Sequence, residues 1–275
     1  MVIAAPDKRA RIAELGKRKW IKTDISERAL EQLEDLMHED HDQRPRCMLL
    51  VAESNMGKTA IAMRHAKRYP PKSDPNAESD IVPIIYNLIP PSPDEWAFND
   101  KLLTMLHAPR PPRQRTSEAR EQFIRVAKKA RVRMIILDEI QYILAGTERN
   151  QSHFRNLIKY YSNELRIPIV ALGVDTSIRA LHADEGLKNR FELMRLPTWS
   201  YDADFLNLLV SLETWISLHR PSNLTEESMA NRILKKTEGR TGRICRLLKL
   251  AAISAIRDDS ERITLQTLDN CGYDP

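Results

Sequence analysis

Residues 47–63 read CMLLVAESNMGKTAIAM, an apolar run followed by a short polar stretch and the start of a second apolar pattern. The run Cys47–Val51 predicts a short buried strand, and the pattern after Thr59 predicts a helix. Gly57-Lys58-Thr59 between a strand and a helix is typical of a phosphate-binding loop, G-x-x-x-x-G-K-[ST]. Ala52 stands where that pattern has its first glycine, which eases the turn out of the strand. We therefore expect Ala52 to be acceptable if its φ is negative.

The loop supplies the groups that bind a nucleotide. Backbone N–H groups of residues 54–59 can surround a phosphate chain at a helix N-terminus, where anions are favoured. Lys58 is expected to reach the β- and γ-phosphates, and the Thr59 hydroxyl to hold Mg²⁺. The expected ATP contacts are Glu53, Ser54, Asn55, Met56, Gly57, Lys58, Thr59 and Ala60. The alternative is a helix that merely begins with Gly-Lys-Thr.

A second motif, MIILDE at 134–139, combines four apolar residues with two carboxylates. A buried strand that ends in Asp138-Glu139 places both at the carboxyl edge of a parallel sheet, where α/β folds bind ligands. We expect Asp138 to support the Mg²⁺ shell and Glu139 to polarise an attacking water. A solvated acidic strand end is the alternative, but the two motifs together predict a nucleotide site.

The rest of the chain predicts an α/β fold with a parallel sheet. Apolar strands at 81–88 and 167–172 alternate with helices of 10–17 residues, a pattern that covers both faces of a parallel sheet. Pro83 favours an edge position for the strand at 81–88. From Tyr201 onward the pattern contains only helices. We therefore predict a basic N-terminal arm or short helix outside the core (1–22), an α/β nucleotide-binding domain (23–199) and a small helical lid domain (200–275).

Three further segments resemble parts of AAA+ ATPases. The strand exit IVALGVD puts Asp175 where that superfamily carries its first sensor residue beside the γ-phosphate. The segment Lys188–Phe191 resembles the arginine-finger segment, which implies that Arg190 enters the nucleotide site of a neighbouring subunit; a surface arginine at a helix end is the alternative. EGRTGR at 238–243 stands where the second sensor lies, with Arg243 as our choice and Arg240 as the alternative.

In the order AESNMGKT, IILDE, IPIVALGVD, LKNRFE and TEGRTGRICRLLKLAA, the chain resembles the TniB/TnsC family of transposition ATPases from about residue 24 to 270. The resemblance implies an AAA+ core with a helical lid, hydrolysis of Mg-ATP, and assembly on double-stranded DNA as a ring or helical filament. Because Gly173-Val174 stands where the family often has Gly-Thr, we expect the hydrolysis to be slow. The resemblance further implies that the protein marks target sites for a DDE transposase. Two alternatives share the core: a replication-initiator or helicase-loader ATPase, and a nucleotide-gated scaffold that scarcely hydrolyses ATP.

Charge supports a polyanionic partner. The net charge is +5, and basic residues gather in several clusters. In TniB/TnsC-like proteins DNA contacts the segment after the second strand, which implies contacts from Lys101, Arg110, Arg113 and Arg115 on a proline-stiffened loop. Because no aromatic residue stands between these arginines, we expect backbone contacts that are largely independent of sequence.

Composition excludes several other classes of protein. No apolar run is long enough for a membrane helix or a secretory signal, so we expect no membrane partner. Three cysteines, far apart and without a CxxC pair, predict thiols in a reducing cytosol and argue against a disulfide framework or zinc site. The family resemblance implies that this is a bacterial cytoplasm. The chain has no G-x-S-x-G elbow, which argues against a serine hydrolase.

Overall fold

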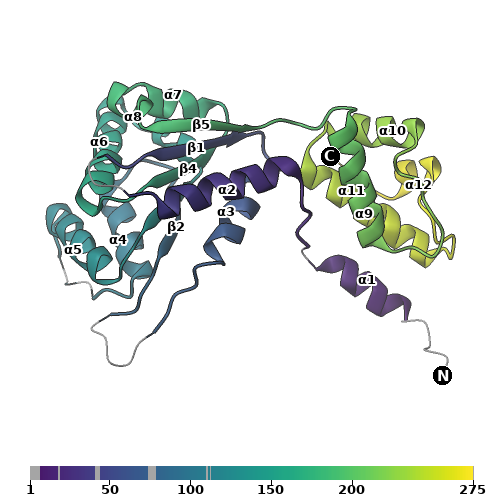
Figure 1. Cartoon of the computed structure of the whole chain (residues 1–275), viewed down its shortest axis with the longest axis horizontal. Coiled ribbons are helices and arrows are strands. Elements are labelled where there is room, and N and C mark those ends of the chain that lie inside the picture. The colour runs from purple at the N-terminus through teal and green to yellow at the C-terminus, as the bar shows by residue number, and fades with distance from the viewer. Residues whose placement is uncertain are drawn as a thin grey trace. The chain divides into compact units, whose positions relative to one another are not determined.

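The computed structural model describes residues 7–17, 19–40, 44–73, 79–109, 111 and 113–274 (Figure 1). The chain divides into two compact units, each with its own apolar core. The first unit comprises Met1–Glu27, Ser54–Gly57 and Pro197–Pro275. The second comprises Arg28–Glu53 and Lys58–Leu196.

The second unit is built on a five-stranded parallel sheet with the order β2-β3-β4-β1-β5. Its strands are β1 (Cys47–Ala52), β2 (Ile84–Leu88), β3 (Met134–Asp138), β4 (Ile169–Gly173) and β5 (Phe191–Leu196). The predicted α/β class with a parallel sheet is confirmed, and β2, which follows Pro83, lies at a sheet edge as expected.

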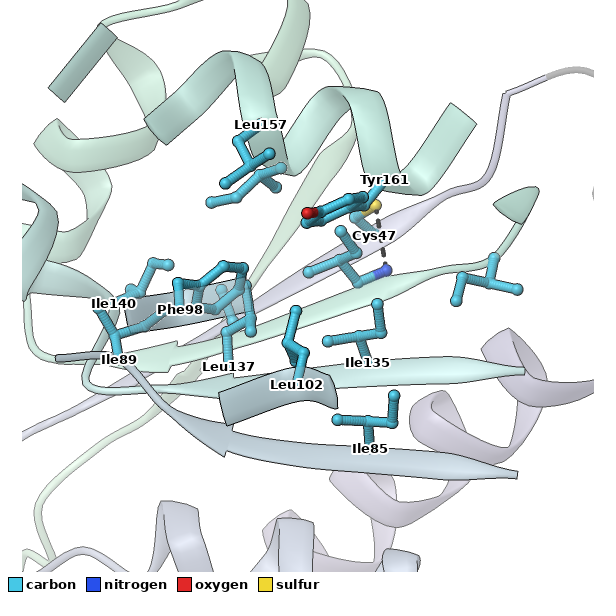
Figure 2. Close-up of a cluster of buried hydrophobic side chains, with 14 of the residues drawn as sticks. Cys47, Ile85, Ile89, Phe98, Leu102, Ile135, Leu137, Ile140, Leu157 and Tyr161 are labelled. Atoms are coloured by element: carbon cyan, nitrogen blue, oxygen red, sulfur yellow. Dashed lines mark hydrogen bonds between the residues drawn. The ribbon is translucent and has the colours of Figure 1, made fainter. Parts of the chain in front are cut away.

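Helices cover both faces of this sheet. They are α2 (Asp24–His38), α3 (Lys58–Ala66), α4 (Glu95–Met105), α5 (Thr116–Lys129), α6 (Glu148–Leu165), α7 (Thr176–His182) and α8 (Glu185–Lys188), with the 3₁₀ helix η1 (Ile140–Ala145) after β3. Figure 2 shows the core on one face, where Phe98 of α4 and Tyr161 of α6 pack over Ile135 and Leu137 of β3. Alternate strand residues point to the opposite face, which carries α2 and α3 (Figure 1).

The first unit is helical. It contains α1 (Lys8–Gly16), α9 (Ala203–Ile216), α10 (Glu227–Thr237), α11 (Thr241–Arg257) and α12 (Leu265–Asn270). Its core joins Phe205 and Leu209 of α9 to Leu247 and Ala251 of α11. The helical character expected after Tyr201 is therefore present in the structure, while the predicted boundaries at residues 22 and 199 stay predictions.

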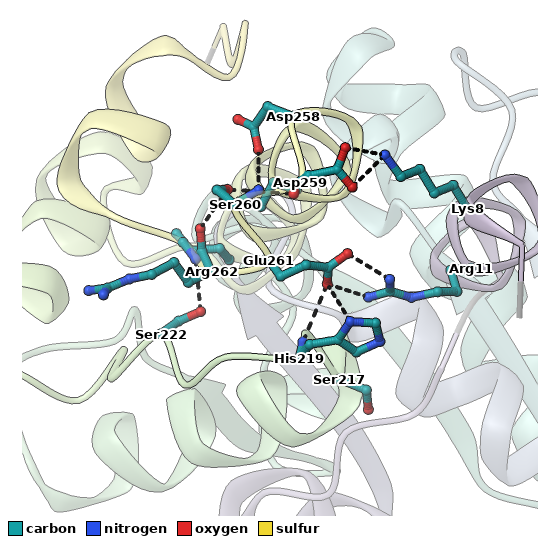
Figure 3. A network of polar contacts seen from close by, with 12 residues as sticks. Lys8, Arg11, Ser217, His219, Ser222, Asp258, Asp259, Ser260, Glu261 and Arg262 are labelled. Atoms are coloured by element: carbon teal, nitrogen blue, oxygen red, sulfur yellow. Dashed lines mark hydrogen bonds and ion pairs between the residues drawn. The ribbon is translucent and has the colours of Figure 1, made fainter. Parts of the chain in front are cut away.

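The N-terminal segment forms a short helix, one of the two forms expected, but this helix is not outside the core. Leu15 of α1 is only 5% exposed and belongs to the core of the helical unit. On the same helix, both terminal nitrogens of Arg11 donate to the Glu261 carboxylate at 2.7 Å (Figure 3). The charged residues of this helix masked a buried apolar residue, because one leucine in nine positions gives little periodic signal.

Strand β5 is absent from the sequence-based prediction. Phe191 and Leu196 are buried, but Glu192, Leu193 and Arg195 between them are exposed, since β5 is an edge strand. These exposed positions interrupt the continuous apolar run by which the other strands, including the edge strand β2, were recognised. Among the described residues, no helix is long and apolar enough to cross a membrane.

Candidate nucleotide-binding site

The loop between β1 and α3 has the backbone geometry that a phosphate cradle requires. Ala52 is the last residue of β1, and α3 begins at Lys58. Asn55 and Gly57 have positive φ, 66° and 95°, whereas Ala52 does not. A φ of 95° is strained for any residue with a Cβ, so the glycine at 57 is required by the turn. The missing glycine at position 52 therefore leaves the strand exit unstrained.

Lys58 is buried at the base of this loop. Its side chain donates from Nζ to the carbonyl oxygens of Ala52 at 2.7 Å and Glu53 at 3.1 Å. Burial lowers the pKa of the Lys58 ammonium, while the nearby carboxylates of Glu139 and Asp138 oppose this shift. The lysine therefore lies within the electrostatic field of both carboxylates that follow β3.

Asp138 joins the loop to the end of β3. Its Oδ2 accepts a hydrogen bond from the Thr59 hydroxyl at 2.7 Å, and its Oδ1 accepts from the Glu139 N–H at 2.9 Å. The Tyr86 hydroxyl also donates to Oδ2, because β2 pairs with β3 in a register that sets Leu88 beside Asp138. Burial, together with the hydrogen bond to Asp138, raises the pKa of Tyr86 well above its usual value.

The donor atoms at this point fit a magnesium ion. Mg²⁺ prefers oxygen ligands at about 2.1 Å in octahedral geometry, so two neighbouring ligands lie about 3 Å apart. The Thr59 hydroxyl and the Asp138 carboxylate are 2.7 Å apart, close to that spacing. The fit is consistent with the predicted roles of these two residues as magnesium ligands.

Glu139 follows directly and has a left-handed backbone, with φ at 59°. Its Oε2 accepts a hydrogen bond from the amide nitrogen of Gln141. The strand ending and the following 3₁₀ helix therefore place Asp138 and Glu139 together with Lys58 and Thr59 at one edge of the sheet, as the two motifs predicted.

Asp175 lies beyond β4 at the N-terminal end of α7 and forms an ion pair with Arg195. Arg195 pairs with Val51 across the β1–β5 register, so it lies near the carboxyl end of β1. A phosphate near Asp175 would meet a paired carboxylate, whose charge Arg195 offsets. Sequence reasoning missed Arg195 because β5 was not predicted.

Arg190 lies at the amino-terminal end of the parallel strands, opposite to the end that carries the loop. It directly precedes Phe191, which pairs with Cys47, the first residue of β1. Five residue steps along β1, roughly 17 Å at 3.3 Å each, separate that level from Ala52. Nη1 of Arg190 donates to the side-chain oxygen of Asn163 at 2.7 Å. Within one chain, therefore, the structure does not bring Arg190 to the loop.

The two candidates for the second sensor share a partner in the helical unit. Arg243 Nη1 lies 2.9 Å from one carboxylate oxygen of Glu238, and Arg240 Nη2 lies 3.1 Å from the other. Also within this unit, the Gly242 N–H donates to the carbonyl of Asn55 at 2.7 Å, which sets the first turn of α11 beside residues 54–57.

Three of the four expected DNA-binding residues lie in the described chain. Lys101 on α4 is exposed and donates to the Leu88 carbonyl at 3.1 Å. Arg113 and Arg115 are exposed on the turn that leads into α5. Arg110 lies outside the described residues. Trp96 of α4 is 51% exposed and lines a small cavity together with Arg113, so an aromatic ring does lie near this turn.

Sequence reasoning did not find Tyr86, Gln141 or Ser177, which contact the predicted carboxylates directly or through one another. Tyr86 lay on a predicted strand and Gln141 stands two residues after Glu139. Their polar character was visible in the sequence, but their direction depends on strand register and on the turn after β3.

The comparison with protein families shows which family the chain belongs to. Residues 11–201 match the family described as Bacterial TniB protein, which is more than half of the chain. The chain belongs to the TniB family. The expected resemblance is thereby confirmed over that range. No curated protein matches the chain.

Solved structures similar to this TniB-family chain show its fold. The ORC1 protein of Aeropyrum pernix in complex with DNA has a TM-score of 0.66 and 17% identity, covering 97% of this chain and 70% of that one. The ORC2 protein of A. pernix in ADPNP-ADP complexes gives 0.64 and 13%, covering 94% and 70%. Cdc6p from Pyrobaculum aerophilum gives 0.64 and 17%, covering 90% and 67%. The fold is therefore that of the AAA+ P-loop ATPases.

Proposed function

We propose that this TniB-family protein binds Mg-ATP at the carboxyl edge of its sheet and hydrolyses it. The observation that carries the proposal is the contact between Thr59 and Asp138, 2.7 Å, beside the buried ammonium of Lys58. Mg²⁺, when bound, would offset phosphate charge. Thr59 and Asp138 would hold it through oxygen atoms, and Lys58 would exchange its two carbonyl partners for charged phosphate oxygens, which form stronger hydrogen bonds.

Glu139 is the candidate for the general base. In the proposed reaction its carboxylate accepts a proton from water as that water attacks the γ-phosphate, and the loop N–H groups of residues 54–59 stabilise the developing charge. The carboxylate stands one residue after Asp138, at the same sheet edge as the loop. Asp175 remains the proposed first sensor and Arg243 the proposed second sensor, with Arg240 as its alternative.

Arg190 would complete the site of a second subunit. Arg190 lies at the amino-terminal end of the strands, whereas Lys58 follows the carboxyl end of β1. This separation favours action between subunits over action within one chain. An arginine inserted beside a neighbour's γ-phosphate stabilises charge in the transition state, and it also makes assembly depend on ATP. We therefore propose a homo-oligomer, as a ring or helical filament, in which nucleotide bridges adjacent subunits and hydrolysis favours disassembly.

Double-stranded DNA is the proposed scaffold for this oligomer, and a DDE transposase is the proposed partner that it recruits in the bacterial cytoplasm. Family membership supports the role in transposition. The exposed side chains of Lys101, Arg113 and Arg115, which lie on or beside the α4–α5 connection, support contacts to DNA phosphates. Arg110 is proposed from the sequence alone.

Sedimentation with double-stranded DNA tests the proposed assembly. Wild-type protein is spun without nucleotide, with ADP and with a slowly hydrolysed ATP analogue, and Lys58→Ala and Arg190→Ala are run alongside. Large DNA-bound assemblies that require the analogue, and that both substitutions abolish, would support the proposal. A monomer that responds to neither nucleotide nor DNA would contradict it.

Salt dependence tests the DNA contacts separately. Affinity for DNA falls as salt rises. Each phosphate contact that is removed should make the plot of log affinity against log salt shallower by about 1 in slope. We expect Arg113→Ala and Arg115→Ala to do so regardless of DNA sequence. Arg125→Ala, an exposed change farther along α5, serves as the matched control. An unchanged slope in the two test variants would argue against this turn as the DNA-binding element.

A further inference from the structure

Gln141 connects Glu139 to the end of β4. It lies in η1, two residues after Glu139, and its side chain hydrogen-bonds to Glu139 and to two residues of the β4–α7 segment. Its amide nitrogen donates to Oε2 of Glu139. Its amide oxygen accepts from the Ser177 hydroxyl at 3.1 Å and from the Val174 N–H at 3.4 Å.

The partners on the β4 side fix which way the amide points. The Val174 N–H can only donate, and the fully buried Ser177 hydroxyl donates to the same oxygen. The carbonyl end of Gln141 must therefore face β4, because an NH₂ group there would meet a donor. Consequently the NH₂ end of the amide faces the Glu139 carboxylate. An ionised carboxylate has no hydrogen to donate, so it acts only as an acceptor.

Gly173 provides independent support for this arrangement. A Cβ on residue 173 would lie 2.6 Å from the Gln141 amide oxygen and 1.9 Å from the Ser177 hydroxyl. Neither distance is possible for non-bonded heavy atoms, so any side chain at 173 would separate the three residues. The last residue of β4 is thus the one that allows Gln141 and Ser177 to meet.

We propose that Gln141 is a positioning residue that holds the Glu139 carboxylate in the direction needed to activate water, and that it links this direction to the β4–α7 turn. The inference rests on the proposed hydrolysis. A carboxylate that accepts through Oε2 loses rotation about its terminal torsion, which otherwise is broad. Its other oxygen, Oε1, then has one defined direction in which to accept a proton.

The turn that Gln141 contacts also carries Asp175, which pairs with Arg195. A displacement of residues 174–177 would therefore move the two donors that hold the amide oxygen of Gln141 and, with that amide, the NH₂ group that holds Glu139. In this way the orientation of the general base depends on the segment where the first sensor is expected.

Gln141→Ala tests the inference through the difference between turnover and binding. We expect kcat to fall by about 10-fold to 100-fold, the range seen when groups that orient a reactive side chain are removed. The affinity for a Mg-bound ATP analogue, measured by fluorescence titration, should stay within about twofold because Gln141 contacts no loop residue that the proposal assigns to phosphate. Gln32→Ala, an exposed glutamine on α2, is the control.

Two further variants keep the test independent of folding defects. Gln141→Glu retains the shape and places a carboxylate against Glu139, so like-charge repulsion should lower kcat at least as far as the alanine change. Ser177→Ala removes one of the two donors to the amide oxygen and should give a smaller loss of kcat with the same unchanged affinity for the analogue.

A double-mutant cycle with Glu139→Gln shows whether Gln141 acts through Glu139. If it does, Gln141→Ala should cause no further loss of turnover once Glu139 is replaced. Additive losses, or Gln141→Ala at wild-type kcat while Glu139→Gln is inactive, would overturn this inference and leave the proposed hydrolysis intact. Turnover by Glu139→Gln equal to that of wild type would overturn the proposed role of Glu139 as the general base, and the inference with it, whereas absence of turnover in the wild type would overturn the proposed hydrolysis.

Discussion

At the scale of single residues, the orientation of the Asp138 carboxylate is fixed by the hydrogen-bond donors around it. Thr59 and Tyr86 both donate to Oδ2, and the Glu139 N–H donates to Oδ1. Hydrogen bonds to an ionised carboxylate are stronger than neutral ones and fix its orientation. A magnesium ligand held in this way is preorganised, since its oxygens do not need to reorient when the ion arrives.

Tyr86→Phe should therefore weaken magnesium-dependent nucleotide binding without affecting the rest of the loop. We expect affinity for an ATP analogue to fall about 10-fold with Mg²⁺ present and to stay unchanged in EDTA, because phenylalanine keeps the ring and removes one donor to Asp138. Fluorescence titration measures both. Tyr142→Phe, a partly exposed tyrosine on η1, is the control. Wild-type affinity in magnesium would show that Tyr86 does not orient the ligand.

Glu139→Gln separates an ATPase from a nucleotide-gated scaffold. The amide keeps the size of the side chain but cannot accept a proton from water, so kcat should fall by about 10²-fold to 10⁴-fold. Affinity for nucleotide should be retained, because Lys58 and Thr59 are untouched. Steady-state phosphate release measures the change. A scaffold would show almost no difference between wild type and variant.

Sequence alone predicted Lys58, Thr59, Asp138 and Glu139, because each belongs to a contiguous motif whose chemistry is set by its neighbours in the chain. The residues that support them come from other elements. Tyr86 reaches Asp138 through strand pairing, and Ser177 reaches Gln141 through the approach of α7 to the end of β4. Such contacts depend on register and on turn geometry, which a single sequence does not specify.

At the scale of elements, α1 is held to the helical unit by the apolar side chains of Ile12 and Leu15 and by two ion pairs. Leu15 packs in the core, Lys8 pairs with Asp259, and Arg11 pairs with Glu261 (Figure 3). The Arg11 pair is bidentate and well shielded, with both side chains about one-eighth exposed (13% and 12%). The Arg11 guanidinium lowers the pKa of Glu261 to about 2.

Glu261→Gln should destabilise the helical unit at neutral pH. Its pKa is lowered in the folded state, so its ionised form adds stability that is present above the unfolded pKa of about 4.5 and is lost as pH falls toward 2. We expect a loss of about 1–2 kcal/mol at pH 7, since solvent still screens part of the attraction. Urea unfolding followed by tryptophan fluorescence measures it.

The difference between wild type and Glu261→Gln should shrink when the same titration is repeated below about pH 4. Glu227→Gln, an exposed glutamate at the start of α10, controls for the loss of one charge in the same unit. Equal stability of wild type and Glu261→Gln at pH 7 would mean that the ion pair does not hold α1.

Strands that are mostly buried were predictable, including the edge strand β2, whereas the largely exposed strand β5 was not. The strands recognised from sequence, β1 to β4, show runs of apolar residues because helices cover them. In β5 the exposed Glu192, Leu193 and Arg195 break that run. In α1, charged residues likewise interrupt the apolar pattern, so the burial of Leu15 was not predicted from sequence.

At the scale of the whole molecule, Lys58 and Arg190 lie at opposite ends of the parallel strands. Lys58 follows the carboxyl end of β1, whereas Arg190 precedes β5 at the level where β1 begins. We therefore propose that one chain carries two halves of different sites. In this proposal a complete site needs the loop of one subunit and the arginine of another, so activity should depend on assembly.

Mixing two inactive variants tests this claim most directly. Lys58→Ala lacks a working loop but keeps Arg190, and Arg190→Ala lacks the arginine but keeps the loop, so each should be inactive alone. Mixed in equal amounts on double-stranded DNA, they should recover at most about one quarter of wild-type ATP turnover, because only a pairing of an intact loop with an intact arginine forms a working interface, and one in four random pairings is of this kind. No recovery in an assembly shown to contain both variants would contradict a site shared between subunits.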